Sequence, residues 1–511
     1  MLNMPVRTAA FAVSLILGSV FSGACAGSAM AAPRAVEVAR TRVIPACTRF
    51  VDAAATAGGT GTVARPFKTI TTAIASAPAA AIICVAQGVY KEKLLPGTKP
   101  FTLAGGFQRG KAFKVRDSAR FVSKAQGNGL GSFIRIEDPG PAGNQLTAID
   151  GFEITGYSQA IYREYYVSQR FNITNNNIHD NVCAEPALAG AGFALNNVSG
   201  TIRGNVLLGN RCDRGGAGFL NDSLNENSVS ILNNRVEKNA GTEPVTAHGG
   251  AFYFFTNRLT ITGNEIIDNT VTGYGAGLFV GAYTPGGQFT NARMSWNIYR
   301  GNRAGGSGGG FFCDDGANCT SEHEIYDSNC GANIYVDGGS DGSGPTIARF
   351  NHVTSVRGRT VGCGAAGAGV RIDKASLVAD TYSFTNAIFW GNAAGSDFSV
   401  SCERECANAR ISVTHSMVQK NYVNNGGLNI TFGAGIVAPQ NPLFVAPATG
   451  DFHLKSRNGH FTPAGRVPDA VSSPALAKAD PAGASNLDPA CAGNRSELGA
   501  YGNSAEASCA P

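Results

Sequence analysis

The feature that most constrains this 511-residue chain is a pair of asparagines, Asn-x4-Asn, that repeats through its middle. The first asparagines of successive copies are 29, 29, 30 and 33 residues apart. The copies are NNIHDN (Asn176, Asn181), NVLLGN (Asn205, Asn210), NRVEKN (Asn234, Asn239), NEIIDN (Asn264, Asn269) and NIYRGN (Asn297, Asn302). Such a period is typical of solenoids, in which each repeat stacks on the next.

A second, glycine-rich element follows each asparagine pair. Its copies read AGAGFAL, RGGAGFL, HGGAFYF, GYGAGLF, GSGGGFF and GAAGAGVRI. Two short strands per unit, with no room for a ten-residue helix, predict the coil of a β-solenoid. Identical asparagines on stacked coils then hydrogen-bond along the axis, as in cross-β ladders, so we interpret them as structural.

Composition agrees with a turn-rich β protein. The chain has 66 glycines and only 15% charged residues. Its net charge is +5, but no basic cluster stands out, so we expect no nucleic-acid partner. We expect no transmembrane segment, because no apolar run after the N-terminus is long enough to cross a bilayer. We also expect a monomer.

The N-terminus has the features of an export signal. Arg7 precedes the apolar run Ala9–Phe21, and an A-x-A site follows at Ala29–Ala31. We therefore predict a signal peptide over 1–31 and an exported protein that is extracellular, periplasmic or associated with the cell surface. Lipidation of Cys25 is the alternative, although the preceding residues lack the usual leucine.

The cysteines agree with export. Removal of Cys25 with the signal leaves twelve, an even number in a compartment that permits disulfides. Sequence alone does not determine connectivity, but proximity suggests Cys47–Cys84, Cys183–Cys212, Cys313–Cys319, Cys330–Cys363, Cys402–Cys406 and Cys491–Cys509. A zinc site is the alternative; the chain has no CxxC spacing and only seven histidines.

Both ends of the repeat region resemble a known group of proteins. The segment GTGTVARPFKTITTAIASAPAAAIICVAQGVYKEKL (59–94) looks like the entry of right-handed parallel β-helix proteins of the pectin-lyase-like superfamily. NPLFVAPATGDFHL (441–454), SPALAKAD (473–480) and SELGAYG (496–502) resemble the end of exported β-helix proteins with a choice-of-anchor Q domain. The resemblance implies an all-β, right-handed parallel β-helix with an N-terminal helical cap, but no particular activity.

We divide the chain accordingly. After the signal peptide come an N-terminal cap with the first coil (45–100), parallel β-helix coils (101–440) and a C-terminal closing region (441–511). Apolar residues at 67, 70, 73 and 74 form a helical stripe. A helix there would cover the open strand edge at the end of the solenoid.

The direction of each side chain follows from alternation along the second strands. We align these strands on a small residue: Gly192, Gly218, Ala251, Gly277, Gly310, Asn333 and Gly369. Positions one and three after this residue are apolar, Phe219 among them, and should face the core. Positions two and four, Leu220 among them, should then face outward. They give a stripe for binding sugars: Tyr253, Phe255, Phe279, Phe312, Tyr335 and Asp222. A covering loop is the alternative.

Three acids occupy the outward column on successive coils. Asp314, Asp337 and Asp373 should lie about 4.8 Å apart, a spacing at which like charges repel. A cation, for which calcium is the candidate, would stabilise them; otherwise one acid stays protonated, as in glycosidases, or the side chains splay into water. Lyases of this fold use Lys or Arg as base, which makes Arg371 and Lys374 candidates. Polygalacturonases have paired aspartates similar to CDDG (313–316), but their other motifs are absent.

These observations lead to two hypotheses. In the first, the protein binds a polysaccharide or cell-surface glycan, with or without cleaving it. If it is an enzyme, it is a lyase or glycoside hydrolase with Asp314, Asp337, Asp373 and Arg371 as catalytic residues and the three aspartates as metal ligands. In the second, it is a non-enzymatic surface or matrix protein, or an adhesin. The segment 162–166, YREYY, is interpreted as an exposed turn, with a binding loop as the alternative.

Overall fold

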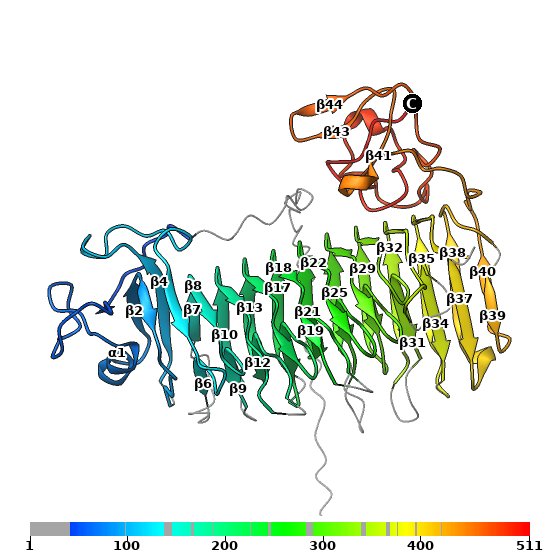
Figure 1. Ribbon diagram of the computed structural model, residues 1–511. Helices are drawn as coiled ribbons and strands as arrows, with labels where there is room; N and C mark the ends of the chain where they lie inside the picture. The colour runs from blue at the N-terminus through cyan, green and yellow to red at the C-terminus, as the bar shows by residue number, and fades with distance from the viewer. Residues whose placement is uncertain are drawn as a thin grey trace, which may run out of the picture. The chain divides into compact units, whose positions relative to one another are not determined.

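In a computed structural model, strands succeed one another in stacked coils (Figure 1). The structure describes residues 41–97, 99–136, 146–164, 168–185, 188–224, 226–243, 247–282, 290–338, 344–363, 368–375, 377–393, 396–420 and 422–511. The predicted signal peptide, Cys25 included, lies outside them, as do Tyr165 and Tyr166. None of the described helices is long and apolar enough to cross a membrane.

Each complete coil contributes one strand to each of three parallel sheets. Sheet A contains β1 (Arg49–Val51), β2 (Ala81–Ala86), β4 (Phe101–Phe107), β7 (Leu146–Asp150), β10 (Gln169–Thr174), β13 (Val198–Arg203), β17 (Ser228–Leu232), β21 (Arg258–Thr262), β25 (Asn291–Ser295), β29 (Asn318–Glu322), β32 (Ile347–Asn351), β35 (Thr381–Thr385), β38 (Arg410–Thr414) and β40 (Ile430–Phe432). Sheet B contains β3 (Gly88–Tyr90), β5 (Ser123–Gln126), β8 (Phe152–Thr155), β11 (Asn177–His179), β14 (Val206–Leu208), β18 (Arg235–Glu237), β22 (Glu265–Ile267), β26 (Ile298–Arg300), β30 (Ile325–Asp327), β33 (Thr354–Val356) and β36 (Ile388–Trp390).

The glycine-rich elements form the third sheet. Sheet C contains β6 (Ile134–Ile136), β9 (Ile161–Arg163), β12 (Phe193–Asn196), β16 (Gly218–Asn221), β20 (Phe252–Phe255), β24 (Leu278–Val280), β28 (Phe311–Cys313), β31 (Ile334–Asp337), β34 (Val370–Lys374), β37 (Phe398–Cys402) and β39 (Val423–Asn425). A smaller parallel sheet lies between B and C in the chain and contains β15 (Arg211–Cys212), β19 (Ala240–Gly241), β23 (Thr270–Val271) and β27 (Arg303–Ala304). The predicted right-handed parallel β-helix is therefore confirmed.

The prediction of two strands per unit was wrong, because it missed sheet A. Its strands precede the first asparagine of each pair, and half of their side chains are polar. In β21, for example, Leu259 and Ile261 face the core, whereas Arg258 and Thr260 are exposed. Polar outward residues interrupt the apolar signal, and the conspicuous Asn and Gly motifs mark only the other two strands.

The asparagine pairs form two buried ladders, as predicted. The side-chain oxygen of Asn234 accepts hydrogen bonds from the backbone N–H and the side-chain amide of Asn205, at 2.9 and 3.0 Å. The amide of Asn205 also donates to the Ile173 carbonyl at 2.8 Å. The same contacts recur from coil to coil, so each buried turn has its polar groups satisfied by its neighbour.

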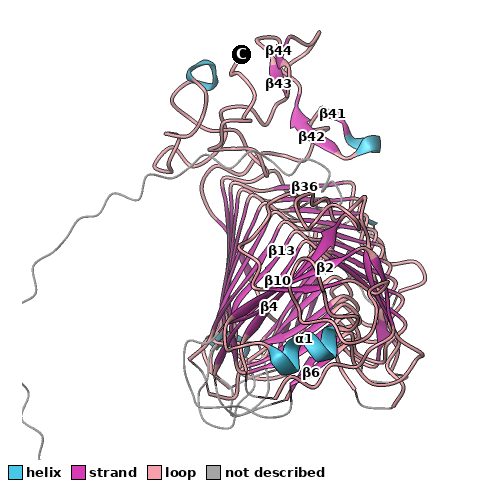
Figure 2. Cartoon of the chain, turned by 90° about the vertical axis from the view of Figure 1, so that its left-hand side faces the viewer, coloured by secondary structure: helices cyan, strands magenta, loops and turns pink. Residues whose placement is uncertain are grey.

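The N-terminal end of the stack is covered by helix α1 (Ile70–Ser76), which packs against β1 and β2 (Figure 2). Ile70, Ala73 and Ile74 form the buried face of this helix. Thr69 caps the helix, and the carboxylate of Glu92 accepts hydrogen bonds from the N–H groups of Ile70 and Thr71 at 2.9 and 2.8 Å. This is the predicted helical cap.

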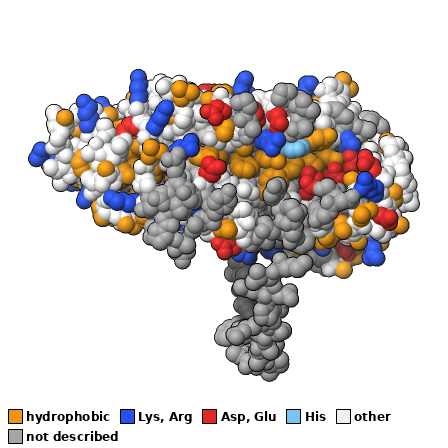
Figure 3. All heavy atoms as spheres, turned by 90° about the horizontal axis from the view of Figure 1, so that it is seen from below, with side chains coloured by type: hydrophobic (Ala, Val, Ile, Leu, Met, Phe, Trp, Pro, Cys, Tyr) orange, Lys and Arg blue, Asp and Glu red, His pale blue; other side chains and the backbone are white. Residues whose placement is uncertain are grey.

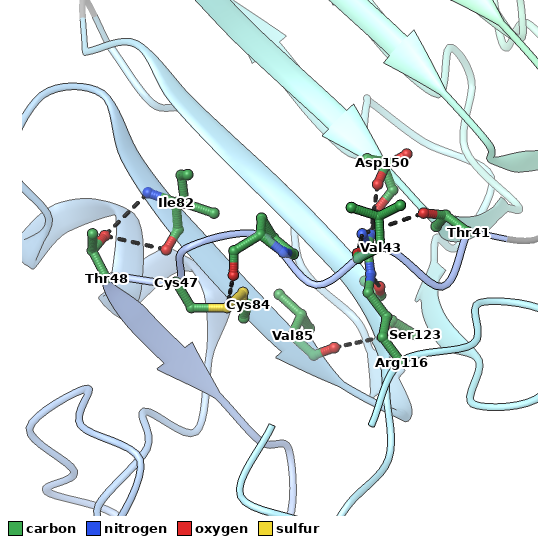
Figure 4. Close-up of a disulfide and its surroundings, with 12 residues drawn as sticks. Thr41, Val43, Cys47, Thr48, Ile82, Cys84, Val85, Arg116, Ser123 and Asp150 are labelled. Carbon is green, nitrogen blue, oxygen red and sulfur yellow. Dashed lines mark hydrogen bonds and ion pairs between the residues drawn. A yellow bond between two sulfur atoms is a disulfide. The ribbon is translucent and has the colours of Figure 1, made fainter. Parts of the chain in front are cut away.

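All six predicted disulfides are present. In Figure 4, Cys47–Cys84 connects the segment before β1 to β2, beside the hydrogen bonds between Thr48 and Ile82. Six disulfides in one chain are typical of proteins that fold in an oxidising compartment.

Residues after β40 pack on sheet B. They include the antiparallel pairs β41 (Phe444–Ala446) with β42 (Asp451–Leu454) and β43 (His460–Thr462) with β44 (Gly465–Val467). Three 3-10 turns complete the described elements: η2 (Cys406–Asn408), η3 (Pro447–Thr449) and η4 (Ala490–Ala492). Phe444, Phe452 and Leu498 share a buried cluster with Val356 and Ile388 of sheet B.

Candidate functional site

The outer face of sheet C carries the predicted aromatic residues. In β20, Phe252 and Phe254 belong to the main core, whereas Tyr253 and Phe255 belong to a separate aromatic cluster outside it. Alternate side chains of a strand point to opposite faces, so this separation shows that Tyr253 and Phe255 face away from the core. Phe279, Phe312 and Tyr335 continue the cluster on the next coils.

The predicted stripe is not open to solvent, however. Tyr253, Phe279, Phe312 and Tyr335 are each less than 10% exposed. Neighbouring coils bring the rings into mutual contact: the centroids of Phe312 and Tyr335 are 4.2 Å apart, and those of Phe279 and Phe312 are 5.0 Å apart. Tyr274 also contacts this row, with its ring centroid 5.9 Å from that of Phe312 and 6.0 Å from that of Tyr335. Figure 3 shows the resulting hydrophobic band with a histidine at its edge.

One coil was misaligned in the sequence prediction. Phe193 pairs with Gly218, and Phe252 pairs with Gly218 from the other side, so Ala217 and not Gly218 occupies the position of Ala251. Phe219 therefore faces outward, and Leu220 faces the core. Gly218 is small for another reason: a Cβ there would lie 2.1 Å from the ring of Phe193. The glycine accommodates an aromatic ring inside the solenoid.

This misalignment also removes Asp222 from the outward column. Asn221 pairs with Phe255 and occupies the predicted position. Asp222 is 7% exposed, and its carboxylate accepts hydrogen bonds from the backbone and side chain of Asn227 at 2.8 and 2.7 Å. It orders a turn, so its predicted position in the outward column was wrong.

The acid column is present as predicted. Asp337 pairs with Asp373, and Asp314 directly follows Cys313, the partner of Val336. Arg371 lies 2.6 Å from Asp373, and its other nitrogen donates to Ser307 at 2.8 Å. The Tyr335 hydroxyl lies 2.9 Å from Asp337 and 3.0 Å from Asp373. An arginine and a phenol therefore reduce the repulsion between Asp337 and Asp373.

Asp314 is stabilised in a different way. Burial raises its pKa well above the ordinary value, and the charges of Asp315 and Asp337 raise it further. The backbone N–H of Asp315 donates to the Asp314 carboxyl at 2.9 Å and opposes this rise only in part. Asp314 thus has the environment of an acid that keeps its proton, next to a carboxylate on the adjacent coil.

Lys374 does not face the column. It follows Val370 and Ile372 on the inward side of β34 and forms a fully buried ion pair with Asp380 at 2.8 Å. The prediction of Lys374 as a candidate base was therefore wrong in its geometry. Lys374 was named as a candidate from its position in the sequence alone, and the buried Asp380 compensates its charge inside the coil.

Among the described residues, no group of three or more His, Cys, Asp or Glu side chains could hold a metal ion. The assignment of Asp314, Asp337 and Asp373 as calcium ligands stays a prediction. The donors that the column has in place are the guanidinium of Arg371 and the hydroxyl of Tyr335, and neither is a ligand for calcium.

A cavity of about 480 Å³ opens at the N-terminal end of the aromatic cluster. Its walls combine aromatic, amide and charged side chains, including Tyr162, Phe219, Tyr253, Phe255, Glu164, Arg214, Gln159, Asn196 and Asn221. Tyr162 and Glu164 come from YREYY, whose alternation turns the intervening Arg163 into the core. The alternation was visible in the sequence, but nothing there indicated that β9, β12, β16 and β20 enclose a cavity.

His248 is a further residue of this face that sequence reasoning did not assign. Its ring lies between those of Tyr253, Tyr274 and Phe279, with centroids 5.9, 5.6 and 5.1 Å away. Burial, assisted by the charge of Arg214, lowers its pKa to about 4. His248 is therefore neutral near pH 7 and contributes to the aromatic surface.

The fold and this face together define a right-handed parallel β-helix with a cavity on one sheet. A family model described as "Right handed beta helix region" matches residues 159–352. A second, described as "Protein of unknown function (DUF1565)", matches residues 54–107.

Solved structures show distant likeness. XylC in complex with xylose has 11% identity and a TM-score of 0.42, covering 75% of this chain and 86% of that one. Pectate lyase Pel9A has 13% identity and a TM-score of 0.40, covering 89% of this chain and 96% of that one. No curated protein matches the chain in sequence.

Proposed function

We propose that this is an exported protein that binds polysaccharide along the outer face of sheet C. The observation that carries the proposal is the 480 Å³ cavity, which combines four aromatic side chains with amides and opposite charges. Sugar rings stack their C–H faces on aromatic rings, while their hydroxyls need hydrogen-bonding partners. The cavity offers both.

The proposal includes export through residues 1–31 and the resemblance of 441–511 to a choice-of-anchor Q region. Both stay predictions. Export is supported by the six disulfides, and together the two features suit a protein that meets its glycan outside the cytoplasm.

A binding panel tests the proposal. Phe255 lies on the cavity wall and is only partly buried, so Phe255→Ala should weaken binding at least tenfold while the protein stays folded. Leu130→Ala, at a 56% exposed position outside the cavity lining, is the matched control and should bind normally. If both variants bind every glycan as the native protein does, this cavity is not the binding site.

A second candidate function is hydrolysis of the bound chain. It is favoured by one observation, the raised pKa of Asp314 beside Asp337, because glycosidases need one protonated and one ionised carboxyl. In this proposal Asp314 donates a proton to the leaving oxygen, and Asp337 acts as nucleophile or base. Elimination by a lyase is less favoured, because Arg371 is paired with Asp373 and Lys374 is buried with Asp380.

Reducing-end release from a polysaccharide panel tests hydrolysis. Asp314→Asn and Asp337→Asn should each lower the rate at least a hundredfold without weakening binding. Formation of unsaturated uronates instead would show elimination. Binding without any product, in the native protein, would leave the non-enzymatic alternative.

A further inference from the structure

The charged side chains of the cavity are already in contact with other groups of the protein. Arg214 donates from Nε to Glu243 at 3.0 Å, and this contact raises the pKa of Arg214. The Tyr162 hydroxyl donates to Glu164. The guanidinium of Arg135 lies over the ring of Tyr162, 4.9 Å from its centroid. A ligand carboxylate would therefore have to compete with Glu243 for Arg214.

The rest of the face is acidic. Beyond the cavity, the only guanidinium of the described acid column is that of Arg371, which is paired with Asp373. Around the cavity and the acid column, the acidic side chains of Glu164, Glu243, Asp314, Asp315, Asp337 and Asp373 accompany the guanidiniums of Arg135, Arg214 and Arg371. Protonation of Asp314 still leaves an excess of negative charge.

Neither Lys374 nor the segments outside the described residues add positive charge to this face. Lys374, the nearest lysine in sequence, points into the coil and is paired with Asp380. Between residues 146 and 420, the segments outside the described residues contain no Lys or Arg in their sequence. They cannot add positive charge to the face.

From this distribution we infer that the polysaccharide is a neutral glycan and not a uronic-acid chain. The inference rests on the proposed function and specifies its ligand. A uronate chain carries regularly spaced carboxylates, which the acidic face repels. A neutral sugar avoids this repulsion, and its hydroxyls can donate to Glu164 and bond to the amides of Asn196 and Asn221 on the same wall.

The test compares matched ligands that differ in charge. The whole protein is titrated with neutral chains, such as β-glucan, xylan, mannan and fully methyl-esterified polygalacturonate, and with acidic chains, such as polygalacturonate and alginate. Each titration is made at low salt, with chelator and separately with calcium. We expect the tightest neutral glycan to bind at least tenfold more strongly than any uronate chain under both conditions.

A charge variant makes the same test independent of the glycan backbone. Glu243→Gln releases Arg214 from its carboxylate partner and should narrow the preference for neutral chains at least threefold, through tighter binding of uronates. Arg214→Gln combined with Glu243→Gln restores neutrality at this pair and should return the preference to its native value. An unchanged preference in Glu243→Gln contradicts the inference.

Failure of the inference is distinguishable from failure of the proposed function. If a uronate chain is the tightest ligand, with or without calcium, the neutral-glycan inference is overturned and polysaccharide binding stands. If no glycan, neutral or acidic, binds at all, the proposed function itself is rejected and the inference with it.

Discussion

Arg371 lies 2.6 Å from Asp373, two positions along the same strand, with its guanidinium 5.3 Å from the ring centroid of Tyr335. The Arg371 side chain is 28% exposed and that of Asp373 15% exposed. One partly buried cation thus compensates a column in which Asp337 and Asp373 are adjacent. The repulsion expected between stacked acids is relieved by the protein itself.

This arrangement predicts the response to calcium. Because Arg371 and Tyr335 already contact the carboxylates, we expect neither calcium nor a chelator to shift the melting temperature. Thermal unfolding followed by circular dichroism, with magnesium as a control for ionic strength, checks this. A rise specific to calcium that disappears in Asp337→Asn would instead support the calcium site predicted from the sequence.

Removal of the arginine should destabilise the column. In Arg371→Gln the charge of Asp373 loses its partner next to Asp337, and we expect a loss of about 1–3 kcal/mol in the free energy of unfolding, less than for a fully buried pair. Chemical denaturation measures it. Adding Asp373→Asn removes the uncompensated charge and should recover most of the loss. An equal loss in the double variant would contradict an electrostatic cause.

The buried Glu324 predicts that the stability of the protein decreases as the pH rises. It replaces an asparagine in the first ladder, where its Oε1 accepts hydrogen bonds from the backbone and side chain of Asn297 at 3.1 and 2.9 Å. Burial raises its pKa well above 4.5. Because the folded pKa is the higher one, the stability from the protonated carboxyl is complete below the unfolded pKa and decreases as pH rises towards the folded pKa.

The amide of glutamine keeps the acceptor and cannot ionise. Glu324→Gln should therefore stabilise the protein by roughly 1–3 kcal/mol at about pH 8 and have little effect at about pH 4. Denaturation midpoints at the two pH values measure this difference. The exposed Glu185→Gln is the control and should change neither midpoint.

A row of stacked rings predicts that the stability of the protein also decreases in acid. Trp296, His323 and His352 lie on successive coils, with centroids 4.4 and 5.5 Å apart, and His323 contacts the Ala500 carbonyl of the closing region at 3.0 Å. Burial and the neighbouring His323 lower the pKa of His352 from 6.5 to about 3. The unfolded chain therefore binds more protons between these values, and stability is lost as pH falls through this range.

We expect the closing region to be destabilised by roughly 3 kcal/mol at about pH 4 relative to pH 7. Fluorescence of Trp296, which stacks on His323, reports the change during acid titration, with Trp390→Phe removing the second tryptophan. His352→Gln should make the transition less sensitive to acid. The same acid transition in this variant would show that another group is responsible.

The sequence predicted the repeat, the β-helix, the helical cap and all six disulfide pairs, because these depend on local periodicity and short separations. The asparagine ladders are an example: Asn205 and Asn234 have the same environment because each coil repeats the last. The prediction of the outward face was right at Tyr253, Phe279, Phe312 and Tyr335, where alternation from a correct anchor suffices.

The prediction was wrong where one side chain depends on another coil. Gly218 resembles its neighbours in sequence, yet it is small because the ring of Phe193 fills its place, and this shifts Phe219, Leu220 and Asp222 by one position. Lys374 faces inward, where it forms a buried ion pair with Asp380. Neither partner is adjacent in sequence.

By itself, therefore, the sequence determined the architecture and the chemistry available on each coil. Only the tertiary structure decided which of these side chains are covered and which line a cavity. The physical reason is that burial and pairing depend on the stacking of neighbouring coils: the rings of Phe312 and Tyr335 pack against each other, whereas those of Tyr162 and Phe255 border an open cavity.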